Sequence, residues 1–264
     1  MNRVFAKAAW ALFGACTTIF LIAPVLLIAV YSFSKSRYFR LPIRQFSLDW
    51  YVAFFASQTF RDAMFNTIVI AVIVTPLCLI AALVTAHVMA RSQFAGKSVI
   101  DALILSPLIV PGVVTGVAFL SLFRILGIDI GLVRMSIAMV VVSFPYALRA
   151  LAANYGSVGV ALEEAARDLG AGRLQTYLRV TLPQLKPGLI AGTIFVAVEV
   201  IDNFAVNAFL VDLHSNTLPI AAYQHVRDFD DPLVAVMSTL LSLLSLIFVL
   251  IFNRLVGLEK IARS

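Results

Sequence analysis

The stretch that decides the fold reads Glu164-Ala165-Ala166-Arg167-Asp168-Leu169-Gly170 and, after nine further residues, Val180-Thr181-Leu182-Pro183. This stretch is polar and helix-forming, yet it lies between long apolar segments. Its pattern predicts a short amphipathic helix, a turn that glycine permits and a stop at proline. Such an element offers a rigid surface to a soluble partner, so we interpret it as a docking element.

The composition around this stretch is that of a membrane protein. Of the 264 residues, 61% are hydrophobic and 13% are charged, and the mean hydropathy is +0.98. Soluble domains have about 45–50% apolar and about 25% charged residues. A run of about 20 apolar residues crosses a bilayer as a helix, because a helix satisfies its own backbone groups. We therefore expect an all-α, polytopic protein in which residues 1–264 form a single transmembrane domain.

Six apolar segments are long enough to cross the bilayer. The predicted spans are 8–33, 64–89, 98–126, 132–154, 188–211 and 232–256. The first span is too long for a cleaved signal sequence and is expected to remain as an anchor. With both termini in the cytoplasm, twelve Lys and Arg residues lie inside and eight outside, a bias that favours this orientation.

Four prolines lie within the predicted spans. They are Pro76 in the second span, Pro107 and Pro111 in the third and Pro145 in the fourth. Each removes a backbone donor and is expected to kink its helix. Kinks within a helix bundle often mark a transport pathway.

Two GxxxG pairs let helices approach closely. They are Gly112 with Gly116, and Gly188 with Gly192. Lipid provides no hydrophobic force between helices, so small residues at a contact favour association. An interface with another subunit and packing within the chain are equally compatible with these pairs.

Several function classes are excluded by what the sequence contains. The net charge of +6 is explained by basic residues at cytoplasmic span ends, so we expect no nucleic-acid binding. The sequence contains neither a Walker A pattern nor HExxH, and its three histidines are scattered. Cys16 and Cys78 fall within predicted spans and are expected to be packing residues. We therefore expect no enzymatic chemistry and no metal in this chain.

The longest cytoplasmic excursion of the chain is the loop 155–187. Its first part predicts a helix with one apolar face and a charged remainder. Gly170 and Gly172 permit a tight reversal, and a second short helix is predicted from Arg173 to Val180, ending near Leu182-Pro183 and Lys186-Pro187. The apolar face comprises Ala161, Leu162, Ala165, Ala166 and Leu169, and the charged residues are Glu163, Glu164, Arg167 and Asp168.

These residues resemble the EAA signature of permease subunits of binding-protein-dependent ABC importers. The signature consists of Glu-Ala-Ala, three residues, Gly, nine residues, an aliphatic residue, one residue and Leu-Pro, and every spacing matches. Val180 stands where the family usually has isoleucine. The six spans, with the motif between the fourth and the fifth, also resemble this family, which implies a type I ABC importer permease-like fold.

The resemblance implies that the loop carries a coupling helix inserted into a groove of a cytoplasmic ATPase. The residues implied in coupling are Glu163, Glu164, Ala165, Ala166, Asp168, Gly170, Leu182 and Pro183. ATP and Mg would be held by an ATPase dimer, so this chain would need no cofactor. The other implied partners are a second, non-identical permease subunit and a periplasmic or extracellular solute-binding protein. The implied location is the inner membrane of a bacterium, with both termini cytoplasmic.

The fifth predicted span contains four polar residues on one helical face. They are Glu199, Asp202, Asn203 and Asn207, spaced i, i+3, i+4 and i+8. An Asp at membrane depth costs about 2.5–3.5 kcal/mol on insertion scales and usually faces water or a partner charge. We interpret this face as a pathway for a small cation. The alternative is a set of structural ion pairs with Arg124, Arg134 or Arg149, or a carboxyl kept neutral by burial.

The end of this span is also similar to the second permease subunit of spermidine/putrescine-type importers. The similarity covers Asp202-Asn203-Phe204-Ala205-Val206, Leu218-Pro219 and the external stretch 228–232. Asn203 replaces the second acid of that family's acidic pair, although Glu199 lies one turn earlier. The implied solute is a polyamine or another amine-containing cation. The alternatives are a secondary transporter or channel using Glu199 and Asp202 for ion coupling, and a membrane scaffold without transport activity.

Overall fold

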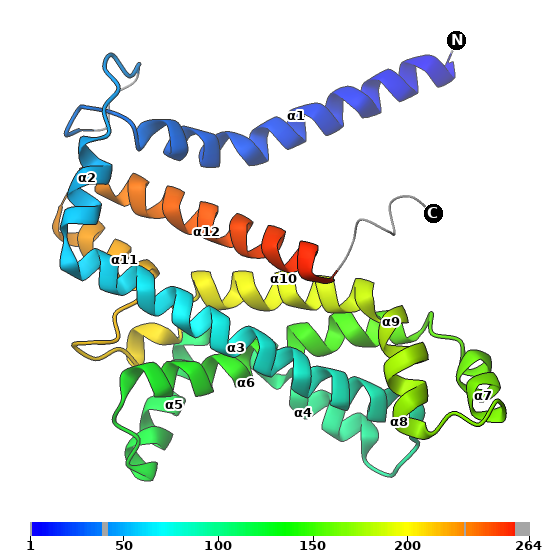
Figure 1. Cartoon of the computed structure of the whole chain (residues 1–264). Coiled ribbons are helices and arrows are strands. Elements are labelled where there is room, and N and C mark those ends of the chain that lie inside the picture. Colours follow the sequence, from blue (N-terminus) through cyan, green and yellow to red (C-terminus); the bar gives the residue numbers. More distant parts are fainter. Residues whose placement is uncertain (1, 39–41, 230, 257–264) are drawn as a thin grey trace. The chain divides into compact units, whose positions relative to one another are not determined.

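The computed structural model describes residues 2–38, 42–229 and 231–256. Within these ranges the chain is helical, and its β structure is limited to one bridge between Ser34 and Phe46. The elements are α1 (Asn2–Tyr31), α2 (Asp49–Ala56), α3 (Gln58–Arg91), α4 (Lys97–Ile109), α5 (Gly112–Leu126), α6 (Gly131–Tyr155), α7 (Val160–Asp168), α8 (Arg173–Thr176), the π-helix η1 (Tyr177–Thr181), α9 (Leu182–Gln184), α10 (Lys186–Asp202), the 3₁₀-helix η2 (Asn207–Phe209), α11 (Leu218–Asp228) and α12 (Leu233–Val256) (Figure 1).

Between four and six helical segments of the described chain are long and apolar enough to cross a membrane. Helices α1, α3, α6 and α12 qualify alone. The pair α4 and α5, bent by 107°, and the run 173–184 with α10, bent by 68°, qualify if each pair forms one crossing. The predicted number of six equals this upper limit.

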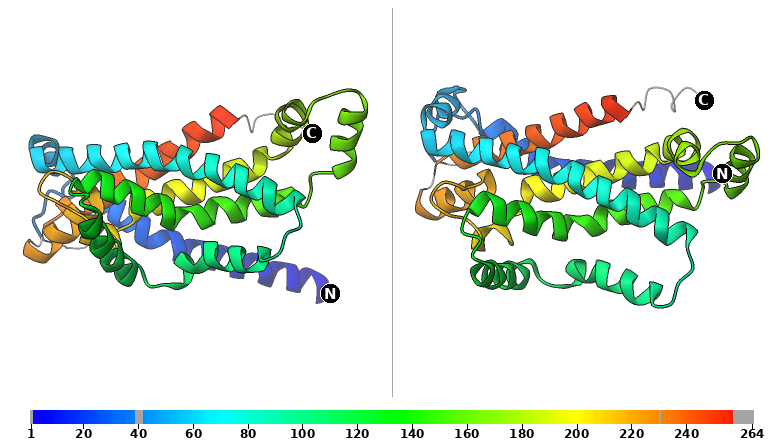
Figure 2. Two further views of the ribbon diagram at one scale, coloured as in Figure 1. Left: turned by 90° about the horizontal axis from the view of Figure 1, so that it is seen from below. Right: turned by 60° about the horizontal axis from the view of Figure 1, so that its bottom comes forward.

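The predicted third span, 98–126, is wrong as a continuous helix. Figure 2 shows α4 and α5 as separate helices that point in different directions. The break lies at Val110, which is extended (φ −78°, ψ 130°). A residue before proline is driven out of the helical region by the proline ring, and Pro111 follows Val110. Pro111 therefore divides this span instead of kinking it, whereas Pro76, Pro107 and Pro145 lie inside uninterrupted helices.

The predicted fifth span, 188–211, is also wrong as a helix over its whole length. Helix α10 ends at Asp202, and Asn203 is extended (φ −69°, ψ 105°). The chain then continues irregularly into the short η2. The nine residues 203–211 of the predicted span therefore lie outside α10. Asn203 and Asn207 are consequently not part of the helix that carries Glu199 and Asp202.

The described chain divides into two compact units. One comprises Met1–Arg61 and Ala221–Leu243, and the other comprises Asp62–Ile220 and Leu244–Ser264. In the first unit, the apolar window of α1 is exposed along its length, as expected of a helix that faces lipid or another subunit. Cys16 of α1 is exposed, so its predicted role in packing is wrong, whereas Cys78 of the second unit is buried.

The core of the second unit is formed largely by α3, α6 and α10, and α6 and α10 lie side by side (Figures 1 and 2). A Cβ at Gly188 would lie 2.8 Å from Asn154 Cβ and 3.1 Å from the Ala150 carbonyl oxygen. A Cβ at Gly116 would lie 2.9 Å from the Val206 carbonyl oxygen. Both GxxxG pairs therefore contain a glycine that packs against this same chain, which favours the second of the two alternatives.

Candidate functional site

Helix α7 and its glycine turn occur as the sequence predicts. The helix ends at Asp168, and Gly170 adopts a positive φ of 89°. The Ala171 N–H donates to the Ala166 carbonyl (3.0 Å) and the Gly170 N–H to the Arg167 carbonyl (2.8 Å). These two bonds form a Schellman motif, which satisfies carbonyls left free at a helix end. The turn thus fixes where α7 stops and where the next helix starts.

The polarity of α7 is reversed relative to a helix that packs its apolar side inward. Its only buried residue is Glu163, which is 2% exposed. Leu162 is exposed, and the Leu169 that follows the helix is 90% exposed. The apolar face predicted from the sequence is therefore present, but within the described chain nothing covers those leucines.

Glu163 is held by two residues from elsewhere in the second unit. Arg91, the last residue of α3, donates through Nε to Glu163 Oε2 and through Nη2 to Oε1, both at 3.0 Å. The Thr181 hydroxyl donates to Oε1 at 2.7 Å. Burial favours the neutral acid, but these hydrogen bonds and the charge of Arg91 outweigh burial and hold the pKa of Glu163 below its usual value. We call Arg91, Glu163 and Thr181 the Glu163 cluster.

The Glu163 cluster extends into the end of α6. The Nη2 atom of Arg91 also donates to the Val158 carbonyl (3.2 Å), and the guanidinium lies over the Tyr155 ring, 5.6 Å from its centroid. The Tyr155 hydroxyl is 3.2 Å from His87 Nδ1. Helix α7 is therefore fastened to α3, to the end of α6 and to η1 through polar contacts. Sequence reasoning did not identify Arg91, Thr181 or Tyr155 as residues that hold the loop. The one available signal was Arg91 itself, a basic residue near the end of the predicted second span.

The remaining predicted coupling residues divide by exposure. Glu164, Ala165 and Asp168 are exposed, and Ala166 is partly buried. They therefore lie on the accessible surface of α7, whereas Glu163 does not.

The predicted second loop helix is present and ends at Gln184, between the two predicted stops at Leu182-Pro183 and Lys186-Pro187. Helix α8, η1 and α9 form one run that continues to Gln184. Pro183 lies inside this continuous run, directly after the π-helical turn η1. Leu182 and Pro183 are thus part of the second helical run.

The polar residues at the end of α10 form a local hydrogen-bonded turn. Asn203 Nδ2 donates to Glu199 Oε1 (2.8 Å), and Asn203 Oδ1 accepts from the Val206 N–H (3.0 Å). Asn207 Nδ2 donates to the Asn203 carbonyl (3.0 Å). Glu199 is therefore oriented by Asn203.

The four predicted pathway residues do not share one helical face. Glu199 and Asp202 belong to α10, but Asn203 is its extended C-cap and the buried Asn207 begins η2. The turn after Asp202 nevertheless keeps Glu199, Asn203 and Asn207 together through the hydrogen bonds described above. Sequence reasoning therefore grouped these three residues for an incorrect geometric reason.

Asp202 differs from the other three residues because it is exposed. Within the described ranges it has no hydrogen bond or ion pair from its side chain. The predicted alternative of ion pairing with a neighbouring base is not found there: Arg149 pairs with Asp101 (3.0 Å), and the carboxylate nearest to Arg134 is Asp212 (3.9 Å). The Asp202 carboxylate is therefore not engaged by any residue that the structure describes.

The fold and these sites define a polytopic, all-α membrane permease with a helical loop between α6 and α10. Residues 50–258 match the family of binding-protein-dependent transport system inner membrane components, and the chain belongs to this family. It is therefore the permease subunit of an ABC importer and not an enzyme; it is a multi-pass inner membrane protein.

The matches with curated relatives cover most of this chain and most of each relative. The chain is 27% identical to the spermidine/putrescine transport system permease protein PotC of Haemophilus influenzae, over 95% of this chain and 96% of that protein. It is 27% identical to the putrescine transport system permease protein PotI of Escherichia coli, over 84% and 81%. A chain of the bacterial alginate ABC transporter, solved in complex with an alginate pentasaccharide-bound periplasmic protein, has the same fold, with a TM-score of 0.72 and 15% identity over 98% of this chain and 97% of that one.

Proposed function

We propose that this chain is half of an ATP-driven importer in which the loop 155–187 docks on a cytoplasmic ATPase subunit. The observation that carries the proposal is the reversed polarity of α7: Glu163 fastens the helix to the membrane domain, while Glu164 and Leu162 face outward. A short helix that is rigidly attached on one side and exposed on the other is suited to transmit a movement of its partner.

The same proposal defines the other components. An ATPase pair binds ATP and Mg, and its closure moves α7 and thereby the spans to which α7 is attached. A second, non-identical permease subunit forms the other half of the path, as the relation to the polyamine permeases supports. A soluble binding protein delivers the solute, as the periplasmic protein in the alginate complex supports. Both termini and the loop 155–187 are on the cytoplasmic side, in keeping with the distribution of basic residues.

The coupling proposal is tested by reversing the charge of Glu164. Glu164→Lys is expected to leave membrane insertion unchanged but to abolish co-purification of the ATPase and ATP-driven uptake. The reason is that Glu164 is exposed and can pair with a basic residue of the ATPase, whereas a lysine would repel that residue. Asp129→Lys, an equal charge change in the exposed connection between α5 and α6, is the matched control and should retain both activities. Normal ATP-coupled uptake by Glu164→Lys would contradict the proposal.

For the solute, we infer a small amine-containing cation of the polyamine class. Asp202 is exposed and has no side-chain partner among the residues that the structure describes, and Glu199 lies one turn away with its carboxylate held by Asn203. Two carboxylates one helical turn apart suit a ligand with separated ammonium groups. The curated relatives named above are spermidine/putrescine and putrescine permeases.

The solute proposal is tested with Asp202→Asn. We expect uptake of a labelled polyamine to fall about tenfold, corresponding to about 1.4 kcal/mol of lost attraction for the cation, with ATPase co-purification unchanged. Asp129→Asn, which removes an exposed carboxylate away from α10, is the control. Unchanged uptake by Asp202→Asn would remove Asp202 from the path, and uptake without any ATPase would favour a secondary transporter or channel instead.

A further inference from the structure

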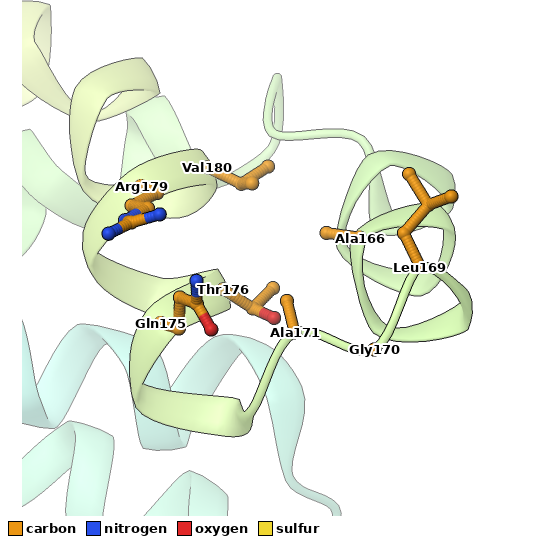
Figure 3. Close-up of a pocket in the computed structure, with 8 residues that line it drawn as sticks. All are labelled: Ala166, Leu169, Gly170, Ala171, Gln175, Thr176, Arg179 and Val180. Carbon is orange, nitrogen blue, oxygen red and sulfur yellow. The ribbon is translucent and has the colours of Figure 1, made fainter.

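A cleft separates the end of α7 from the second helical run of the loop. It has a volume of about 270 Å³, and its lining residues are Ala166, Leu169, Gly170, Ala171, Gln175, Thr176, Arg179 and Val180. Figure 3 shows Ala166 of α7 and Val180 of η1 on opposite sides of this cleft, with Thr176 and Ala171 between them. The Schellman turn at Gly170 holds the two helices apart and so creates the space.

The size of the cleft limits what it can hold. Sites for small molecules usually measure about 300–1,000 Å³, so a cleft of 270 Å³ is small for a metabolite. At about 30 Å³ per water molecule, it corresponds to roughly nine waters. A space of this size suits one or two protein side chains.

The lining specifies the chemistry of those side chains. Alanine, leucine and valine provide an apolar surface, and Arg179 is the one charged residue in the lining. Arg179 forms no ion pair with any residue that the structure describes. Leu169 of the lining is 90% exposed, and Leu174 of α8 is 71% exposed. Uncovered leucines beside an unpaired guanidinium are typical of a surface that is completed by a partner.

We propose that the ATPase inserts an apolar side chain, accompanied by a neighbouring carboxylate, into this cleft, where the carboxylate pairs with Arg179. The inference rests on the proposed function and adds a second contact to it: α7 enters the ATPase, and the ATPase enters the cleft behind α7. Reciprocal insertion resists both pushing and pulling along the loop, whereas a single inserted helix resists pulling only weakly. The concave space between two helices favours a protein side chain over a lipid headgroup.

Site-directed photocrosslinking tests where the ATPase lies. A diazirine-bearing aliphatic residue is placed at Val180, within the cleft, or at Glu164, on the outer surface of α7, in the complete transporter. We expect both positions to crosslink to the ATPase, with the adduct of position 180 next to an Asp or Glu of the ATPase. Crosslinks to the ATPase from 164 but only to lipid or to the permease pair from 180 would overturn the cleft contact and leave the proposed function intact. Absence of ATPase adducts from both would overturn the proposed function itself.

A pair of charge reversals tests the role of Arg179. Arg179→Glu and Arg173→Glu change the charge of the same loop equally, so long-range attraction of the ATPase is altered equally. Arg173 is exposed and does not line the cleft. We expect Arg179→Glu to weaken ATPase binding about tenfold more than Arg173→Glu, and an acid-to-base change at the crosslinked ATPase residue to restore binding. Equal weakening by both variants would show that Arg179 acts only through general charge and would overturn the specific pair.

Discussion

Glu163 and Asp202 are two acidic residues of the same compact unit with opposite surroundings. Glu163 is 2% exposed, and its carboxylate accepts three hydrogen bonds, two from Arg91 and one from Thr181. Asp202 is exposed, and its side chain has no partner among the residues described. A carboxylate whose acceptor capacity is used internally positions the chain, whereas one whose capacity is unused is available to a mobile cation. Under the proposed function, Glu163 belongs to the element that transmits force and Asp202 to the element that meets the solute.

The largest expected effect is the loss of the Glu163 cluster. Glu163→Gln removes the charge opposite Arg91, which is 21% exposed. Breaking a buried pair from one side costs about 3–5 kcal/mol, and we expect a value near the lower limit because Arg91 retains some contact with water. The amides of residues 157–181 should then exchange with solvent at least about 100-fold faster, as measured by hydrogen exchange on the purified subunit.

The neighbouring glutamate supplies the matched control for this experiment. Glu164→Gln makes the same chemical change one residue further along α7, at an exposed position. It should leave the exchange of residues 157–181 almost unchanged. In a double-mutant cycle, Arg91→Met with Glu163→Gln should cost less than the sum of the two single changes. Additive costs would mean that Glu163 and Arg91 do not stabilise the loop as a pair.

A smaller effect is expected at the end of α10. Asn203→Ala removes the hydrogen bonds to Glu199 Oε1 and from the Val206 N–H, which together contribute about 1–2 kcal/mol. We expect faster exchange in residues 203–211 and unchanged exchange in the loop 155–187. Asn203→Asp keeps the acceptor for the Val206 N–H but places a second carboxylate beside Glu199, so like-charge repulsion should make its effect at least as large as that of Asn203→Ala. If Asn203→Ala also released the loop, the two regions would not be independent.

Much of the difference in burial between Glu163 and the exposed acidic residues could not be predicted from the sequence. Glu163 and Glu164 are adjacent residues of one type, and only the position of Arg91, 72 residues earlier in the chain, decides which of them is buried. The presence of α7, its end and its glycine turn could be predicted, because these depend on local spacing and on the positive φ that glycine permits. The fifth span was predicted too long, since apolar composition continues past Asp202 although Asn203 leaves the helix. Hydropathy records the preference for lipid and not the local termination of a helix.

A change of about 1–2 kcal/mol is expected at the turn that ends α7. Gly170 has a φ of +89° and no atoms close to the position of a Cβ, so Gly170→Ala introduces backbone strain of about 1–2 kcal/mol without a steric clash. We expect fraying of the last turn of α7 and weaker ATPase binding, with the Glu163 cluster preserved. Gly170→Asn is the control, because asparagine tolerates the left-handed region better, and it should retain more binding than the alanine variant. Equal binding by the two variants would show that the turn conformation does not matter for docking.

The smallest effect is expected on acidification. The pKa of Glu163 is held below its ordinary value of 4.5, so near that pH the unfolded chain binds more protons at this residue than the folded chain does. The stability contributed by the ionised Glu163 is therefore complete above pH 4.5 and is lost as the pH falls through the lower pKa of the folded state. Exchange of residues 157–181, corrected for intrinsic rates, should be constant between pH 7 and 5 and should rise below that range in the native chain. In Glu163→Gln the acid-induced rise should be absent; if it persisted unchanged, a different group would be responsible for loosening the loop.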